Sequence, residues 1–205
     1  MICTILITAL MRYELEHKAK THKRIVEDAS RRFRSEGLGG PGVASVMRDT
    51  GLTHGGFYKH FSSKNDLLVE SIGEAFRQTG DWLVQIAEQS PPGEGWKAMI
   101  AAYLSPEHCD HPEKGCPLAA LGPELGRSDP SVRGRISAEM VNYKNRLVPF
   151  MPGTTVADRE RAFFVIFSTM IGAVEMGRMM SDATARERIL GTTRDFLLEF
   201  AAGAK

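Results

Sequence analysis

The 205-residue sequence lacks the motifs on which most enzyme classes depend. It contains no phosphate-binding glycine loop, no serine nucleophile elbow, no HExxH sequence and no paired CxxC motifs. An enzyme is therefore the weaker of several interpretations. We expect no cofactor and no resident metal.

Cysteines and long apolar runs are also scarce. Three cysteines, an odd number in a chain without a convincing export signal, favour thiols over a disulfide framework. The apolar opening Met1–Leu10 has no basic residue before it and is shorter than the roughly 20 residues that a membrane-spanning helix needs. We expect residues 1–17 to be a disordered or over-called N-terminal arm, and the protein to be cytoplasmic without a membrane partner.

The net charge of +1 hides an uneven distribution. Between Arg12 and Asn65 there are eleven basic and six acidic residues, whereas the rest of the chain has an acidic excess of four. A nucleic-acid-binding protein needs a basic surface for phosphates. The N-terminal quarter is the part that offers one, although a solvated helix face would give the same bias.

Apolar residues recur at helical spacing, and no stretch alternates with period two. We therefore predict an all-α fold with an N-terminal three-helix domain and a C-terminal helical bundle. The strongest boundary is Ser90–Gly93, and the segment Ser105–Pro117 is expected to be a loop. The predicted helices are Thr21–Glu36, Val43–Thr50, His54–Phe61, Lys64–Glu88, Trp96–Leu104, Leu118–Leu125, Pro130–Phe150, Val156–Met180 and Ala183–Ala202.

The second and third helices, joined by a turn at Gly51, form a candidate helix-turn-helix. The string Val46-Met47-Arg48-Asp49-Thr50-Gly51-Leu52-Thr53-His54-Gly55-Gly56-Phe57-Tyr58-Lys59-His60-Phe61, followed by Ser63-Lys64 and Leu67-Leu68, closely resembles the DNA-binding domain of the TetR/AcrR family. The resemblance covers about Thr21 to Ile72. It implies a helix-turn-helix domain over residues 18–66 and a ligand-binding and dimerisation domain over residues 67–205.

The resemblance and the chemistry of the side chains together predict the DNA contacts. Thr53, Tyr58, His60 and Lys64 are expected to meet phosphates, which positions a protein on DNA without reading sequence. His54 and the backbone of Gly55 and Gly56 are expected to meet base edges. Ser45 is a further candidate, and Phe57 and Phe61 are expected to be core.

The resemblance further implies that the last two helices pair with a second copy of the chain, so that a homodimer binds a roughly palindromic operator. A small-molecule effector of unknown identity would occupy an apolar pocket in the C-terminal half. The predicted lining residues are Trp82, Tyr103, Cys116, Phe164, Phe167 and Met170.

The segment Ser105–Pro117 leaves three interpretations open. Cys116, with Lys114 nearby and a helix beginning after it, is a candidate thiol sensor of electrophiles. A metal site that uses His108, Cys109, His111 and Cys116 fits no common zinc spacing, and a loop with one buried cysteine is the plainest account. The sequence predicts a DNA-binding transcriptional regulator, most simply a repressor, with a thiol-gated repressor and a protein-binding helical adaptor as alternatives.

Overall fold

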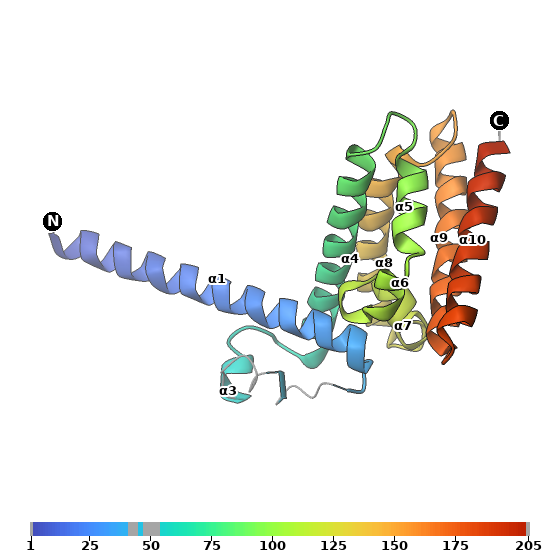
Figure 1. The fold of residues 1–205 in the computed structure, drawn as a ribbon. Coiled ribbons are helices and arrows are strands. Elements are labelled where there is room, and N and C mark those ends of the chain that lie inside the picture. Colours follow the sequence, from blue (N-terminus) through green and yellow to red (C-terminus); the bar gives the residue numbers. More distant parts are fainter. Residues whose placement is uncertain (1, 41–44, 47–53, 204–205) are drawn as a thin grey trace.

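The computed structural model describes residues 2–40, 45, 46 and 54–203 (Figure 1). Over these residues the chain is helical without strands, which confirms the all-α prediction. The helices are α1 (Ile2–Glu36), α3 (His54–Phe57), α4 (Lys64–Glu88), α5 (Gly95–Tyr103), α6 (Pro106–Asp110), α7 (Pro117–Gly126), α8 (Pro130–Leu147), α9 (Val156–Met179) and α10 (Ala183–Gly203), with 3-10 turns η1 (Pro112–Lys114) and η2 (Val148–Phe150).

Five of the helices, α4, α5, α8, α9 and α10, stand side by side as a bundle, and the short α6 and α7 close one end of it (Figure 1). At that end α1 crosses the base of α4 and then projects far from the bundle, with α3 lying beside it. Because α4 packs against both α1 and α8, it belongs to both halves of the molecule.

Local capping explains where several helices begin. The Ser63 hydroxyl accepts a hydrogen bond from the backbone N–H of Asp66, which starts α4 at the predicted residue. At the start of α9, Thr155 and Asp158 form a reciprocal capping box. These side chains satisfy N–H groups that have no partner within their own helix.

Two segments have more helix than the sequence patterns indicate. Residues 2–17, for which a disordered or over-called arm was one expectation, are helical as part of α1, which has 35 residues. The segment 105–117, expected to be a loop, contains α6 and η1, because the Ser105 hydroxyl caps the N–H of His108 and Pro106 occupies the first helical position.

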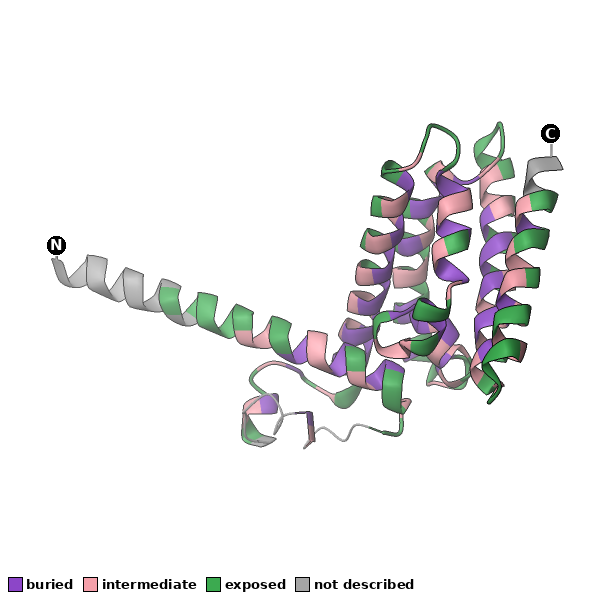
Figure 2. Ribbon diagram, in the orientation of Figure 1, coloured by how far each residue is buried: buried purple, intermediate pink, exposed green. Residues whose placement is uncertain are grey.

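The bundle core is aromatic where α4, α8 and α9 meet. The rings of Phe163 and Phe167 are stacked at 4.4 Å, and Tyr143 meets Phe167 edge-on at 5.9 Å and Phe76 at 5.3 Å. Figure 2 shows this buried seam running along the inner faces of the bundle helices. Burial of such rings is the main stabilising contribution to the bundle.

Candidate functional site

The N-terminal domain is organised around an apolar cluster contributed by α1, α3 and the start of α4. Phe57 and Phe61 are 1% and 2% exposed, and their rings lie 5.4 Å apart, which confirms the prediction that both are core. They are buried together with Ile25, Val26, Ala29, Phe33, Val46, Leu67 and Leu68. The outer side of α3 and the start of α4 is thereby fixed toward solvent.

The predicted DNA contacts fall on and around α3. Gly55, Tyr58 and Lys64 are exposed, with the Tyr58 side chain 66% accessible. Gly56 and His60 are half-buried, and so is Ser45, which is helical. Thr53 lies outside the described residues, and His54 is described only as the first residue of α3.

On the inner side of this surface, His60 packs near a cluster of side chains made of His22, Phe61 and Glu70. The His22 ring lies 5.8 Å from the His60 ring and stacks on Phe61 at 4.6 Å, and His22 Nε2 is 2.6 Å from a Glu70 carboxylate oxygen. Burial, together with the neighbouring His22, Lys18 and Lys59, lowers the pKa of His60. The same surroundings favour the neutral form of the His60 ring in the free protein.

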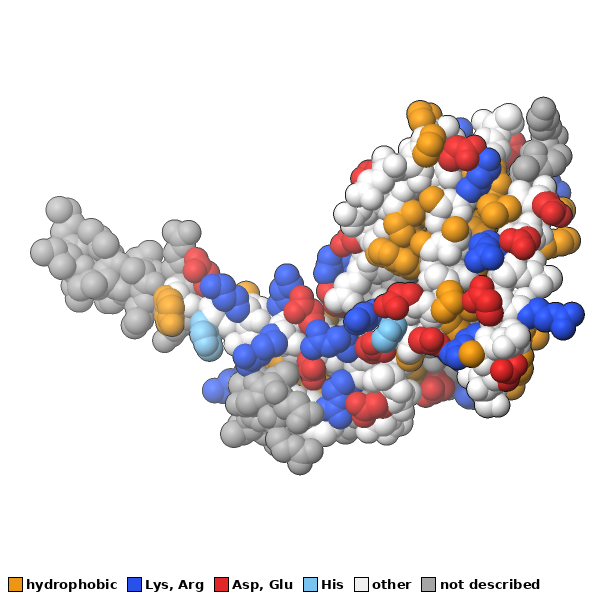
Figure 3. All heavy atoms as spheres, viewed as in Figure 1, with side chains coloured by type: hydrophobic (Ala, Val, Ile, Leu, Met, Phe, Trp, Pro, Cys, Tyr) orange, Lys and Arg blue, Asp and Glu red, His pale blue; other side chains and the backbone are white. Residues whose placement is uncertain are grey.

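Basic side chains gather along α1, next to this surface (Figure 3). The exposed ones are Lys18, Lys20, Lys23, Arg24 and Arg31. Such a stripe supplies the positive potential that draws a polyanion toward the domain.

The predicted ligand residues are only partly brought together. Tyr103, Cys116, Phe167 and Met170 are fully buried near one another, with the Tyr103 and Phe167 rings 6.0 Å apart. Trp82 is half-buried, with its ring 5.5 Å from His108. Phe164 lies on the opposite side of α9 and is 52% exposed, so its side chain faces away from this core.

Cys116 is the N-cap residue of α7, and its thiol is completely buried. Burial raises the pKa of Cys116 and also that of Cys109. A protonated, covered thiol is a poor nucleophile, because the thiolate is the reactive form. This geometry disfavours Cys116 as the primary sensor.

His108 links the chain segments around Cys116, a role that the sequence did not suggest. His108 Nδ1 lies 2.7 Å from the Tyr103 carbonyl, and the backbone N–H of Cys116 points to His108 Nε2 at 3.1 Å. A carbonyl can only accept and an N–H can only donate, so the ring carries its proton on Nδ1. Burial lowers the pKa of His108 to about 4, and the ring is neutral at physiological pH.

Two arginines, Arg34 buried and Arg178 half-buried, hold the same segment. Arg34, on α1 and 3% exposed, donates to the Gly115 carbonyl at 2.8 Å, and Thr79 on α4 donates to that carbonyl at 3.3 Å. Arg178, on α9, donates to the carbonyls of His108, Cys109 and Ala119. We call Arg34, Thr79, the backbone of residues 108–119 and Arg178 the arginine joint.

No local signal in the sequence marks these arginines as ligands of backbone carbonyls. Arg34 lies on what the helical pattern identifies as the charged side of its helix, and its partner is 81 residues away. Burial lowers the pKa of Arg34 to about 10, so the guanidinium remains charged inside the protein.

The hydroxyls of Tyr103 and Tyr143 are also buried. The Tyr103 hydroxyl lies against the Cys116 thiol, whereas that of Tyr143 has no hydrogen-bond partner within the described part of the chain. A buried hydroxyl without a partner is costly, which makes that of Tyr143 a ready donor to an incoming acceptor. Within the same residues, no group of three or more metal-ligating side chains converges.

The curated proteins to which the chain is similar in sequence include helix-turn-helix transcriptional regulators. No family model matches the chain. In sequence it is similar to the helix-turn-helix transcriptional regulator LmrA of Bacillus subtilis, with 25% identity over 113 residues, 54% of this chain and 60% of LmrA. It is also similar to the helix-turn-helix regulator TtgR of Pseudomonas putida, with 29% identity over 79 residues, 38% of this chain and 37% of TtgR. The chain thus spans 60% and 37% of the lengths of these two relatives.

The fold extends the likeness to nearly the whole chain. A TetR-family regulator from Cytophaga hutchinsonii superposes with a TM-score of 0.71 at 18% identity, over 89% of this chain and 96% of that one. The sequence relatives are helix-turn-helix transcriptional regulators. The fold of the chain is similar to that of solved TetR-family regulators.

Proposed function

We propose that this chain is a dimeric repressor that binds a palindromic operator in the cytoplasm and is released by a small molecule. The observation that carries the proposal is the exposed surface of α3 and the start of α4, which carries Tyr58 and Lys64, together with the exposed basic side chains of α1. Phosphate contacts by such residues position a domain on DNA. The glycine at position 55 has nothing within 4 Å of where a side chain would begin, which leaves room for a base edge.

An apolar surface on α9 and α10 supports dimerisation. Phe196 and Phe200 are 61% and 57% exposed, with their rings stacked at 6.0 Å, and Phe164, Met176 and Met179 are exposed on the neighbouring helix. By length and composition α9 could also cross a membrane, but its inner face is packed in the bundle core. A second copy of the chain covers such a surface with closed two-fold symmetry.

The interior of the bundle supports a small effector that carries a hydrogen-bond acceptor. The ring of Tyr143, whose hydroxyl has no partner within the described residues, lies among Phe76, Phe163 and Phe167. An apolar ligand with a carbonyl or ether oxygen would satisfy this hydroxyl. Entry of a ligand into this close-packed region requires side chains and backbone to move. The arginine joint, which binds both α1 and α9, is the route by which such a movement would reach the DNA-binding domain.

The alternative effector mechanism, electrophile sensing through Cys116, is the less favoured because the thiol is buried and its pKa is raised. A Cys116→Ser variant distinguishes the two. Release from DNA by an electrophile that disappears in this variant would establish the alternative.

The DNA-binding proposal is tested by selecting duplexes from a random pool with the purified protein and measuring binding across salt concentrations. Lys64→Gln is expected to weaken binding about equally for all selected sequences and to lower the magnitude of the salt-dependence slope by roughly one. Lys97→Gln, which removes an exposed lysine paired with Glu94 at the far end of the bundle, is the matched control and should leave both unchanged. Failure to enrich any sequence would overturn the proposal.

A further inference from the structure

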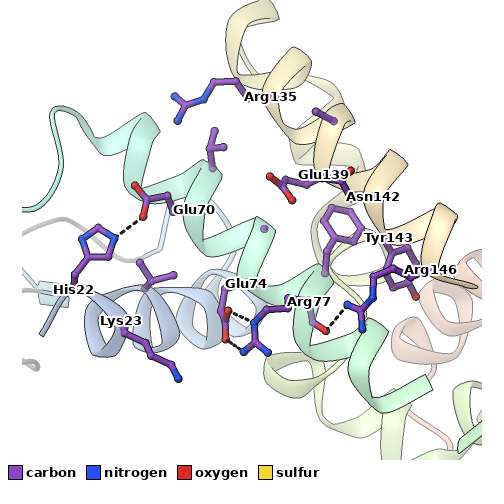
Figure 4. Close-up of a pocket in the computed structure, with 15 residues that line it drawn as sticks. His22, Lys23, Glu70, Glu74, Arg77, Arg135, Glu139, Asn142, Tyr143 and Arg146 are labelled. Atoms are coloured by element: carbon purple, nitrogen blue, oxygen red, sulfur yellow. Dashed lines mark hydrogen bonds and ion pairs between the residues drawn. The ribbon is translucent and has the colours of Figure 1, made fainter. Parts of the chain in front are cut away.

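A groove of about 760 Å³ lies where α1, α4 and α8 meet, outside the buried region around Tyr103 (Figure 4). Residues of the DNA-binding domain form one wall, and residues of α8 form the other. The residues labelled along it in Figure 4 are His22, Lys23, Glu70, Glu74, Arg77, Arg135, Glu139, Asn142, Tyr143 and Arg146. A ligand in this groove would therefore touch both halves of the molecule.

The basic groups of the groove are already matched by carboxylates. Arg77 binds Glu74 at 2.5 Å and Asp81 at 2.7 Å, and Arg146 binds Asp81 at 2.5 Å. The remaining two pairs are Arg135 with Asp66 at 2.7 Å and Lys23 with Glu27 at 3.7 Å. An anion entering the groove would have to compete with an existing partner of each cation.

Glu139, in contrast to these paired charges, has no partner of opposite charge among the described residues. Its side chain is half-buried and points from α8 across the groove toward α4 (Figure 4), and among the described residues it makes no hydrogen bond or ion pair. The space it occupies exists because α4 has a glycine there. A β-carbon on Gly73 would lie 3.4 Å from the carboxyl carbon of Glu139.

The groove also has an apolar floor. Val26, Val69 and Phe76 line it between the two charged walls. An unmatched carboxylate above apolar side chains is complementary to a cation with an apolar body, because the charge is neutralised while apolar area leaves water. A bare metal ion does not fit, because only one carboxylate here lacks a partner.

We propose that the groove, which shares Phe76 and Tyr143 with the buried core, is itself a ligand site that binds an organic ammonium cation through Glu139. The ammonium group lies against the Glu139 carboxylate, beside Asn142, and the apolar body covers Val26, Val69 and Phe76. The site does not depend on DNA binding, and its test needs no DNA.

The test is a ligand-observed NMR titration with benzyltrimethylammonium and its uncharged carbon isostere, neopentylbenzene. The native protein is expected to bind the cation with a dissociation constant on the order of 1 mM, as suits so small a ligand, and to bind the isostere at least tenfold more weakly. Glu139→Gln should weaken cation binding by roughly tenfold. The control Glu88→Gln, which changes an exposed carboxylate at the far end of α4, should have no effect.

A variant that gains affinity distinguishes a specific effect on binding from a loss of binding caused by misfolding. Asn142→Asp places a second carboxylate in the same wall and is expected to tighten cation binding severalfold. Gly73→Leu fills the groove and is expected to abolish binding while the thermal midpoint shows that the protein is folded. Equal binding of the cation and its isostere, or an affinity for the cation that neither Glu139→Gln nor Asn142→Asp changes, would overturn the proposal.

Discussion

The guanidinium of Arg34 on α1 donates a 2.8 Å hydrogen bond to the backbone carbonyl of Gly115, and so joins the DNA-binding domain to the segment that carries Cys116. The same side chain is held by the Ser30 hydroxyl and carbonyl and by Gln78. A buried cation that is bound to oxygens on three sides has one preferred position. The contact therefore fixes where α1 sits relative to the bundle.

Arg34→Gln is expected to lower the free energy of unfolding by about 2–4 kcal/mol, because it removes a buried charge from partners that remain buried. Urea denaturation measures this. Arg31→Gln removes an exposed arginine of the same helix that pairs with Asp28, and should cost less than about 0.5 kcal/mol. Similar losses from both variants would mean that the Gly115 contact contributes little.

Gly115→Ala is expected to destabilise the protein by about 1–3 kcal/mol, because a β-carbon there would lie 2.7 Å from His108 Nε2 and must displace the ring. Gly134→Ala is the matched control. This glycine lies inside α8 with nothing within 4 Å of an added β-carbon, so the change should stabilise the protein by about 0.5–1 kcal/mol. Thermal or urea unfolding of both variants measures these changes. A stabilised Gly115→Ala or a destabilised Gly134→Ala would contradict the prediction.

His108 predicts a pH dependence of stability. Its folded-state pKa of about 4 lies below the unfolded value of 6.5, so the unfolded chain binds the proton first as pH falls. The stability present above pH 6.5 is therefore lost progressively between pH 6.5 and 4, by about 3 kcal/mol in total. His108→Asn keeps a donor toward the Tyr103 carbonyl but cannot titrate. Its urea-unfolding free energy should fall less steeply over this range than that of the native protein.

Phe196→Glu is expected to convert the dimer to monomer, because it places a charge in the apolar surface of α10. Sedimentation velocity measures the change. Val141→Glu alters another exposed apolar residue, 51% exposed and on α8 rather than on the last two helices, and should leave the proposed dimer intact. A native protein that sediments as a monomer would contradict the dimer itself.

In a Cys3→Ser background, the two remaining thiols are expected to react with a disulfide reagent far more slowly in the folded protein than in urea. Both Cys109 and Cys116 are buried with raised pKa values. The reagent therefore has little access to either sulfur, and little of either thiol is present as the reactive thiolate. A fast reaction of Cys116 in the folded state would restore the thiol-sensor alternative.

The helices of the bundle were predictable because their signals are local. Ser63 and the apolar spacing after it define α4 to the residue at both ends. The short α6 was missed because Pro106 and Pro112 were interpreted as loop signals, although Ser105 before Pro106 is a capped helix start. The pairing of α9 with its neighbours was harder, since apolar residues surround that helix and Phe164 and Phe167 could not be assigned to different faces.

The proposed DNA contacts and the arginine joint differ in how far the sequence indicates them. Tyr58 and Lys64 belong to a short contiguous pattern, from which the sequence predicts them as contacts. The arginine joint, by contrast, depends on hydrogen bonds from Arg34, Thr79 and Arg178 to backbone carbonyls far away in the chain. Because every residue has a backbone carbonyl, the residue types do not show which carbonyls accept these bonds. Glu139 resembles any surface glutamate until Gly73 is seen opposite it.

Because α1 is long, a small tilt of this helix about Arg34 displaces its more distant residues by several ångströms. A helix rises about 1.5 Å per residue, so His22, stacked on Phe61, lies roughly 18 Å along the axis from Arg34. If Arg34 acts as the pivot, a tilt of about ten degrees moves His22 by about 3 Å, nearly the 3.4 Å rise between base pairs of duplex DNA. In the proposed repressor, a small rotation at the base of the bundle would therefore put α3 out of register with a fixed operator without any large domain movement.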